Sequence, residues 1–345
     1  MMTHSDVMDS NVPAAATPGA THAIHQLLSA RRFRPVEALP WLLAAAVYFV
    51  LPQYFQLGAQ VLIMVLFALS FDLLLGYGGI VTLGHAAYFG AGAYTAGLLA
   101  RYGWGEPLSA LLVSGLVAGM LGTLAGAVIL RTKGLALLML GMAVSLLLLE
   151  LANTATDITG GADGLQGMDV RPLLGQFEFD MLGKTAYIYS LAVLFLAWVL
   201  LRHLVNSPFG RSLVGIRQNP ARMQALGVSV WGRRLTAFAI SSALAGIAGA
   251  LSAQTSQFVS LSVFSLELSG MVIVMLEMGG VGRLYGAFVG ATVYMVAQDT
   301  LSKDQPATWL FWIGLLLILL VLFNRGGLLG LCDTVRRRIA HKEVS

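Results

Sequence analysis

Charged side chains are scarce in this sequence. Only 11% of its 345 residues are Asp, Glu, Lys or Arg, whereas 57% are hydrophobic. Soluble globular chains carry about 25% charged residues, so this composition excludes a surface that faces water throughout. The 39 glycines agree with this conclusion, because small residues let helices approach closely inside a membrane.

Several patterns that carry chemistry are also missing. The sequence has one cysteine, Cys332, which excludes a disulfide within the chain, and its His, Cys and acidic residues lack metal-ligand spacing. It contains no G-x-x-x-x-G-K-[ST] phosphate loop, and the loops hold no nucleophile paired with a base. We therefore expect no metal and no cofactor on this chain, and no enzymatic activity of its own.

Long apolar runs dominate what is present. A bilayer-spanning helix needs roughly 17–25 apolar residues, and Gly279, Gly280, Gly282 and Gly286 predict a tight turn or a re-entrant break within the later runs. The runs predict an all-α, polytopic integral membrane protein with about ten transmembrane helices. These spans are expected near residues 38–55, 57–75, 80–100, 107–130, 134–153, 186–205, 235–257, 262–278, 284–299 and 308–323.

The basic residues predict the orientation. With the N-terminus inside, the outer segments hold only Arg101, Arg171, Lys184 and Lys303, and the other 17 of the 21 basic residues lie inside. This distribution follows the positive-inside rule and explains the net charge of +4 without nucleic acid. Both termini are then cytoplasmic.

Three regions are expected along the chain. Residues 1–37 are rich in Ala, Ser, Thr and Pro and predict a disordered cytoplasmic tail, because no apolar run there is long enough for a signal peptide. Residues 38–325 form the transmembrane domain, and residues 326–345 form a basic cytoplasmic tail.

The two longest loops differ in charge. The outer loop, 154–185, is mainly acidic, whereas the inner loop, 202–234, has six arginines and no acidic residue. Within the inner loop a short helix is predicted, since Asn219 can cap it, Pro220 suits its first turn and Gly227 can end it. The helix would suit docking of a cytoplasmic partner. Alternatively, the loop only fixes orientation and contacts lipid headgroups.

Ionisable residues fall within or near the apolar spans: Asp72, His85, Glu150, Glu267 and Glu277. Such residues usually face a cavity or a partner. Asp72 and His85 flank a glycine-rich break, and a broken helix presents free N–H and C=O groups to a solute. Alternatively, Gly78 and Gly79 make a tight turn, His85 bonds a neighbouring helix and Glu150 reaches the membrane interface. The candidates for a substrate pathway are Asp72, Tyr77, Thr82, His85, Tyr94 and Glu150.

Four segments resemble one family. They read GYGGIVTLGHAAYFGAGAYTAGLLA (Gly76 to Ala100), TGGADGLQG (Thr159 to Gly167), SPFGRSLVGIRQNPARMQALGV (Ser207 to Val228) and LFNRGGLLGL (Leu322 to Leu331). In this order they are similar to the signatures of branched-chain amino acid ABC transporter permeases, the LivM and LivH type. The resemblance covers roughly residues 40–331, and the long central outer loop favours the LivM type.

Two departures bear on the solute. The segment RTKGLALLML lacks the aromatic residues usual in the family, and GGVGRLYGAF has Arg283 in place of Ser or Thr and Ala287 in place of Pro. The urea permeases have similar late motifs. A urea or short-amide ABC permease therefore remains an alternative to an amino acid permease.

The resemblance implies an importer of branched-chain or other hydrophobic amino acids in the bacterial inner membrane. Its partners would be a LivH-like second permease chain, two cytoplasmic ATPase subunits that carry ATP and Mg, and a periplasmic or extracellular solute-binding protein. The ATPase-coupling candidates are Arg211, Arg217, Asn219, Pro220, Arg222, Ala225, Leu226 and Gly227. The docking candidates for the binding protein are Thr159, Gly160, Gly161, Asp163 and Gly164.

A different class of function is also possible. A stand-alone secondary transporter would use His85, Asp72 or Glu150 as a proton relay and would need no ATPase. The inner loop with its predicted helix discriminates between the two, because a secondary carrier does not need it.

Overall fold

The computed structural model describes residues 39–330, apart from residues 51, 174, 176, 178, 179, 181, 305, 307 and 324–326. The predicted N-terminal tail, 1–37, and nearly all of the predicted C-terminal tail, 326–345, lie outside the described residues. The chain divides into two units, Met1–Leu42 and Leu43–Ser345, and the second contains the helical bundle described below.

The bundle is built from helices, and the described residues contain two isolated β-bridges but no strand. In chain order the elements are α2 (Leu39–Val50), η2 (Pro52–Tyr54), α3 (Phe55–Asp72), η3 (Leu73–Tyr77), α4 (Ala86–Arg101), α5 (Pro107–Ile129), α6 (Leu135–Thr154), α7 (Thr156–Thr159), η4 (Gly161–Asp163), α8 (Lys184–Asn206), α9 (Pro208–Gln218), α10 (Pro220–Ala225), α11 (Val230–Ser256), η5 (Leu261–Phe264), α12 (Leu266–Gly279), α13 (Leu284–Asp304) and α14 (Trp309–Phe323).

Every predicted span contains a helix, and the all-α polytopic membrane fold is confirmed. Among the described residues, five helical segments are long and apolar enough to cross a membrane alone: Pro52–Tyr77, Pro107–Ile129, Leu135–Thr154, Lys184–Asn206 and Val230–Ser256. The helices α12 and α13 meet this test only together, and the pair bends by 114° at the glycine-rich break. The other spans are shorter helices.

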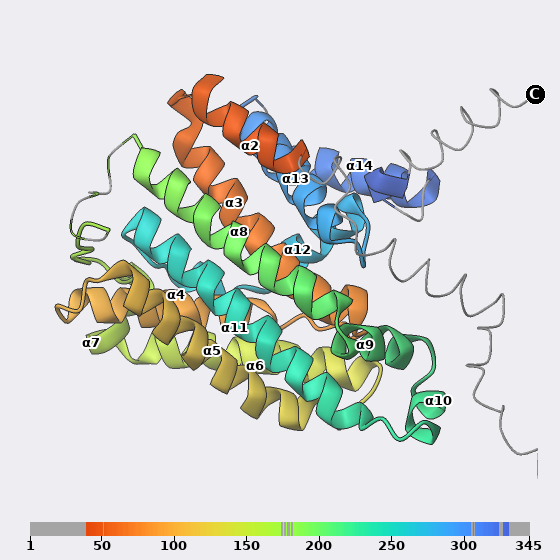
Figure 1. The fold of residues 1–345 in the computed structure, drawn as a ribbon. Helices are drawn as coiled ribbons and strands as arrows, with labels where there is room; N and C mark the ends of the chain where they lie inside the picture. Colours follow the sequence, from red (N-terminus) through yellow and green to blue (C-terminus); the bar gives the residue numbers. More distant parts are fainter. Residues whose placement is uncertain are drawn as a thin grey trace, which may run out of the picture. The chain divides into compact units, whose positions relative to one another are not determined.

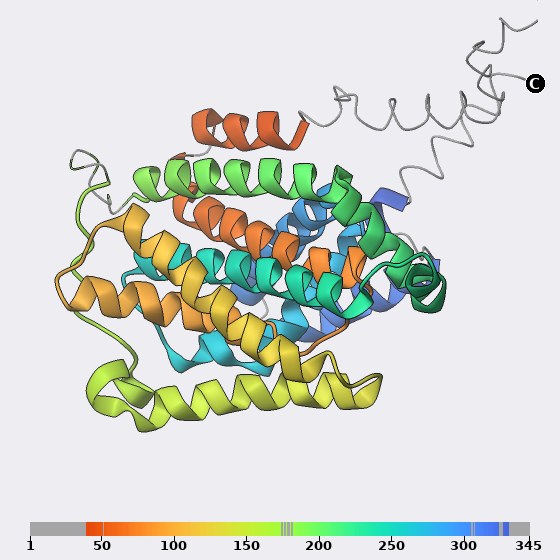
Figure 2. The ribbon, with the colours of Figure 1, turned by 60° about the horizontal axis from the view of Figure 1, so that its bottom comes forward.

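The helices α3, α4 and α11 form the centre of the bundle (Figure 1). Glycine makes their close approach possible, because a Cβ on Gly92 of α4 would lie 2.1 Å from the Gly246 carbonyl oxygen of α11. At the edge of the bundle lies α6, as Figure 2 shows, and its apolar side chains are largely exposed. In a membrane such a surface suits lipid or another apolar chain.

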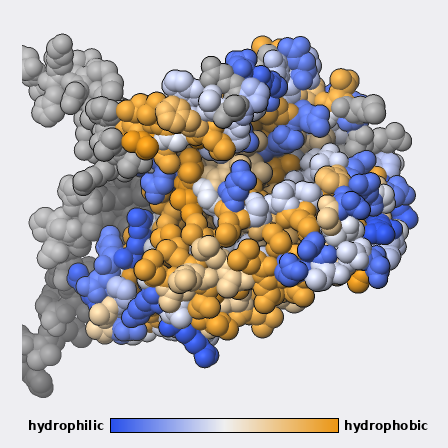
Figure 3. Space-filling view, turned by 180° about the vertical axis from the view of Figure 1, so that it is seen from behind, coloured by the Kyte–Doolittle hydropathy of each residue, from blue (hydrophilic) through white to orange (hydrophobic). Residues whose placement is uncertain are grey.

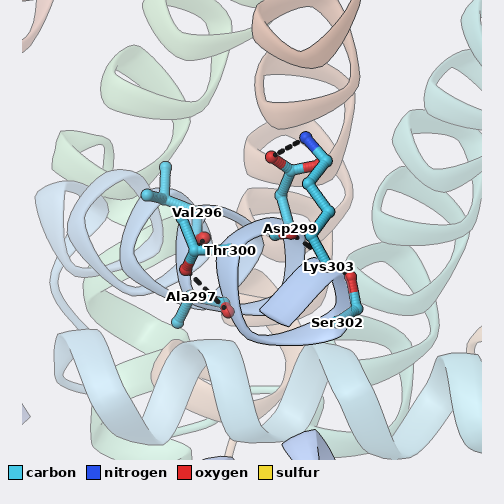
Figure 4. A network of polar contacts seen from close by, with 6 residues as sticks. All are labelled: Val296, Ala297, Asp299, Thr300, Ser302 and Lys303. Atoms are coloured by element: carbon cyan, nitrogen blue, oxygen red, sulfur yellow. Dashed lines mark hydrogen bonds and ion pairs between the residues drawn. The ribbon is translucent and has the colours of Figure 1, made fainter. Parts of the chain in front are cut away.

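The two ends of the bundle are polar. Figure 3 shows a broad apolar region on one face, with hydrophilic residues gathered on both sides of it. At the α7 end, Arg101 donates to the Ile158 carbonyl oxygen at 3.0 Å and Arg171 donates to that of Gly103 at 3.3 Å. These residues, predicted to lie outside, therefore share one end. Lys303, also predicted outside, pairs with Asp299 at 2.7 Å in the last turns of α13 (Figure 4).

Some helices begin or end away from the predicted positions. The span expected at 80–100 becomes helical only at Ala86, because residues 78–85 form a non-helical segment that is apolar enough to resemble a helix in sequence. The inner loop expected at 202–234 is mostly helical: α8 continues to Asn206, α11 begins at Val230, and α9 lies between them. The pair Ser207 and Pro208 caps and starts α9, as Asn219 and Pro220 do for α10.

Candidate functional site

The predicted helix break lies between α3 and α4. The chain leaves α3 through the π-helical turn η3, and Gly79 then takes a φ of +65°, which only glycine adopts without strain. The returning segment is held by polar contacts, since the Ala86 N–H donates to Ser269 Oγ of α12 at 3.0 Å and the Gly84 N–H donates to Thr82 Oγ1 at 3.2 Å. The break is thus a fixed feature supported by a distant helix.

Asp72 lies at the end of α3, fully buried. Its Oδ1 accepts a hydrogen bond of 2.8 Å from the Gly282 N–H, in the break between α12 and α13. Its Oδ2 has no hydrogen-bond partner among the described residues. Nearby, the Arg217 guanidinium of α9 attracts the carboxylate and donates to the Gly76 carbonyl oxygen. The structure therefore joins the two predicted breaks through Asp72.

His85 is buried beside α3. Its Nε2 lies 3.0 Å from Ser70 Oγ, and its ring lies 5.4 Å from the Phe67 ring and 4.9 Å from the Phe71 ring, centroid to centroid. This arrangement matches the alternative in which His85 bonds a neighbouring helix. Its Nδ1 has no partner among the described residues, and a role for it in solute binding stays a prediction.

The remaining pathway candidates are dispersed. Thr82 is buried, and a Cβ on Gly141 of α6 would lie 2.3 Å from its hydroxyl. Tyr77 is half-buried in η3, whereas Tyr94 lies further along α4, toward the α7 end, where its ring stacks on that of Phe264 at 5.4 Å. Glu150 is exposed on α6. The structure therefore does not gather all six predicted residues into one site.

The loop expected to dock a binding protein is folded into the α7 end. Thr159 is buried and donates to the Ala152 carbonyl oxygen at 2.5 Å, whereas Asp163 is exposed. Gly160, Gly161 and Gly164 all take positive φ values, which suits the glycines there. Only part of the predicted docking surface is therefore accessible.

Sequence reasoning missed what lies beneath this loop. Leu165 is fully buried and pairs with Val259, since its N–H donates to the Val259 carbonyl oxygen at 2.8 Å. The two residues belong to a buried outer cluster with Tyr94, Met168 and Phe264. The leucine that follows the TGG-x-x-G pattern is the sequence signal that could have found this contact. It predicts a side chain that anchors the loop.

The predicted helix of the inner loop is confirmed as an element. The Asn219 side chain caps α10 by accepting from the Arg222 N–H at 3.0 Å, and Gly227 follows the helix with a φ of +80°. No residue of α10, including Pro220 and Ala225, is buried, and Leu226 directly after it is 70% exposed. Arg211 of α9 and Arg222 are also exposed.

A longer helix supports α10. The helix α9 buries Leu213 and Ile216 against the bundle, and a Cβ on Gly215 would lie 2.7 Å from Met223 Sδ of α10. The close contact between the two helices holds α10 out from the bundle on a packed base. This arrangement is a preformed protrusion, which suits docking of another protein.

Comparison with known proteins identifies relatives of the whole bundle. Residues 53–321 match the family model described as branched-chain amino acid transport system / permease component. The chain is 28% identical over 297 residues to the high-affinity branched-chain amino acid transport system permease protein LivM of Escherichia coli, covering 79% of this chain and 69% of that protein.

More distant relatives come from an archaeon. The probable LivM of Methanocaldococcus jannaschii is 24% identical, covering 64% of this chain and 68% of that protein. The probable LivH of the same organism is also 24% identical, covering 70% of this chain and 77% of that protein. No solved structure matches.

Proposed function

The chain belongs to the family of branched-chain amino acid transport permease components, and from this membership we propose that it is the membrane-spanning subunit of an ATP-driven importer of branched-chain or other hydrophobic amino acids. The membership covers residues 53–321, which include both helix breaks and the α9–α10 protrusion. The names of the LivM relatives support the solute class.

The protrusion is the observation that carries the ATP-driven mechanism. The helix α10 is capped at both ends, has no buried residue and leaves Arg222 and the adjacent Leu226 exposed. A secondary carrier has no use for such an element. Two ATPase subunits would bind ATP and Mg²⁺ and dock on it, and this chain would bind neither.

The other partners follow from the division of labour in such importers. A LivH-like permease chain would complete the membrane part, and a solute-binding protein would deliver the amino acid at the α7 end. There the exposed Asp163 offers an accessible contact, in the same loop as Gly160 and Gly164. The chain would lie in the bacterial inner membrane with the α9 end and both termini in the cytoplasm.

Reconstitution of the complete complex tests this function. The chain would be co-expressed with the products of neighbouring genes, purified through a tag and placed in vesicles. ATP hydrolysis and uptake would then be measured with a binding protein loaded with leucine, isoleucine, valine, phenylalanine or urea. Co-purification of an ATPase and stimulation by leucine, isoleucine or valine is the expected result.

Two other results would replace the proposal. Stimulation by urea alone would assign a urea or short-amide permease. Uptake by the purified chain without an ATPase, driven by a proton gradient, would assign a secondary transporter instead.

A further inference from the structure

Three segments that are far apart in the sequence meet at the α9 end of the bundle. One is the end of η3 at Gly76, the second is the break between α12 and α13 at Gly282, and the third is Arg217 of α9. The Arg217 guanidinium donates to the Gly76 carbonyl oxygen, and the Gly282 N–H donates to Asp72 Oδ1 at 2.8 Å. We name these four residues the joint.

The joint leaves no room for its parts to move separately. A Cβ on Gly76 would lie 2.2 Å from Asp72 Oδ1 and 2.6 Å from the Gly282 nitrogen. A Cβ on Gly282 would lie 3.4 Å from Arg217 Nη1, and one on Gly79 would lie 2.8 Å from Arg217 Cγ. The end of η3 and the α12–α13 break therefore pack backbone on backbone, whereas Arg217 contacts them through its side chain. We expect a displacement of one segment to be passed on to the others, because packed interiors deform little.

Arg217 differs from Arg211 and Arg222 in its hydrogen bonding. Arg211, Arg217 and Arg222 are all exposed, and of these three only the Arg217 side chain donates a hydrogen bond to a described residue. Arg217, in contrast, turns back to the bundle, where its charge also attracts the buried Asp72 carboxylate. A buried carboxylate is costly without such compensation. The Arg217 guanidinium thus contacts the membrane domain although the residue is exposed.

We propose that Arg217 is a positioning residue that fastens α9 to both helix breaks, so that a movement imposed on α10 displaces η3 and the α12–α13 break together. The inference rests on the proposed function, and it gives the coupling candidate Arg217 a role inside the membrane domain. Because α10 packs on α9 through Met223, the path from α10 to the breaks runs through residues in contact.

The test separates coupling from assembly. In the reconstituted complex, solute moved per ATP hydrolysed would be compared for wild type, Arg217→Met and Arg217→Lys. The matched control is Arg131→Met, in another loop at the α9 end. Arg131 is exposed, and among the described residues its side chain donates no hydrogen bond, so the variant removes a basic charge alone. ATPase co-purification would be measured for every variant.

The expected result is specific to the joint. Arg217→Met keeps its ATPase subunits and hydrolyses ATP, but solute moved per ATP falls at least about fivefold, since one charge-assisted hydrogen bond is lost. Arg217→Lys recovers part of the ratio, because an ammonium group still donates to the Gly76 carbonyl. Arg131→Met matches wild type.

Other results overturn the inference. An unchanged ratio in Arg217→Met would show that the bond transmits nothing, and loss of the ATPase subunits from this variant would make Arg217 a docking contact. If Arg217→Met does not fold, Asp72→Asn is measured in its place. In this variant the amide oxygen still accepts from the Gly282 N–H, but the negative charge near Arg217 is gone. An unchanged ratio of solute to ATP would again refute the joint. Absence of ATP-driven transport in wild type would instead refute the proposed function.

Discussion

Gly92, where α4 packs against α11, offers a direct test of helix packing. In Gly92→Ala the new Cβ would lie 2.1 Å from the Gly246 carbonyl oxygen and 2.4 Å from its Cα. Both are backbone atoms, so no side-chain rotation relieves the clash. The two helices must separate by roughly 1.3 Å to reach ordinary contact, and a gap near 1 Å forfeits on the order of half of the dispersion attraction between the atoms it separates.

The stabilisation that alanine brings to a helix is smaller than this loss of packing. Alanine is favoured over glycine in a helix by about 1 kcal/mol, whereas overpacking a core costs about 1–3 kcal/mol and more where backbones must move. We therefore expect Gly92→Ala to lower the free energy of unfolding by about 1–3 kcal/mol. Unfolding of the purified protein in detergent mixtures with a rising fraction of sodium dodecyl sulfate, followed by circular dichroism, measures this quantity.

The matched control is Gly270→Ala in α12, where a Cβ would meet no atom within 4 Å. This variant should gain about 0.5–1 kcal/mol, because alanine restricts the unfolded chain and suits the helix. Equal shifts in the two variants would refute the reasoning, since they would show that the α4–α11 contact is looser than the structure indicates.

Three further predictions concern the candidate sites. His85→Ala should cost about 3–5 kcal/mol of stability, as for a buried aromatic group, while changing uptake only modestly; complete loss of uptake in a folded variant would assign His85 to the solute path. Ala225→Glu should abolish uptake and leave the chain in the membrane, because α10 is exposed and acid-free; normal uptake would contradict the coupling role. Leu165→Ala should cost about 2–5 kcal/mol of stability, because it leaves a cavity in the outer cluster. Thermal unfolding measures this loss, and an unchanged midpoint would show that the cluster is not packed as described.

Local signals were enough to place the spans and α10. The apolar runs predicted every span, and the cap at Asn219 with the glycine at Gly227 predicted α10. Such signals act within a few residues, so the sequence carries them directly. The helix α9 was missed, although Ser207 and Pro208 carry the same capping signal. The segment 78–85 was taken for helix because a buried non-helical segment can be as apolar as a buried helix.

The sequence named the candidate residues but not the residues that they contact. Asp72 bonds a residue 210 positions away and Arg217 one 141 positions away, and nothing in the local pattern indicates either pair. One of the two alternatives for His85 was a bond to a neighbouring helix, and the structure supplies Ser70 as the partner for that alternative. The wide dispersion of Tyr94 and Glu150 likewise followed only from the packing.

By itself the sequence determined the membrane environment, the helical class, the positions of the spans and the family to which they belong. The tertiary structure alone decided which helices lie at the centre and which residues meet at the joint. The physical reason is that lipid is as apolar as a helix surface. A side chain that faces lipid and one that faces another helix therefore look alike in sequence, and only the fitted backbones, with glycine where they touch, distinguish them.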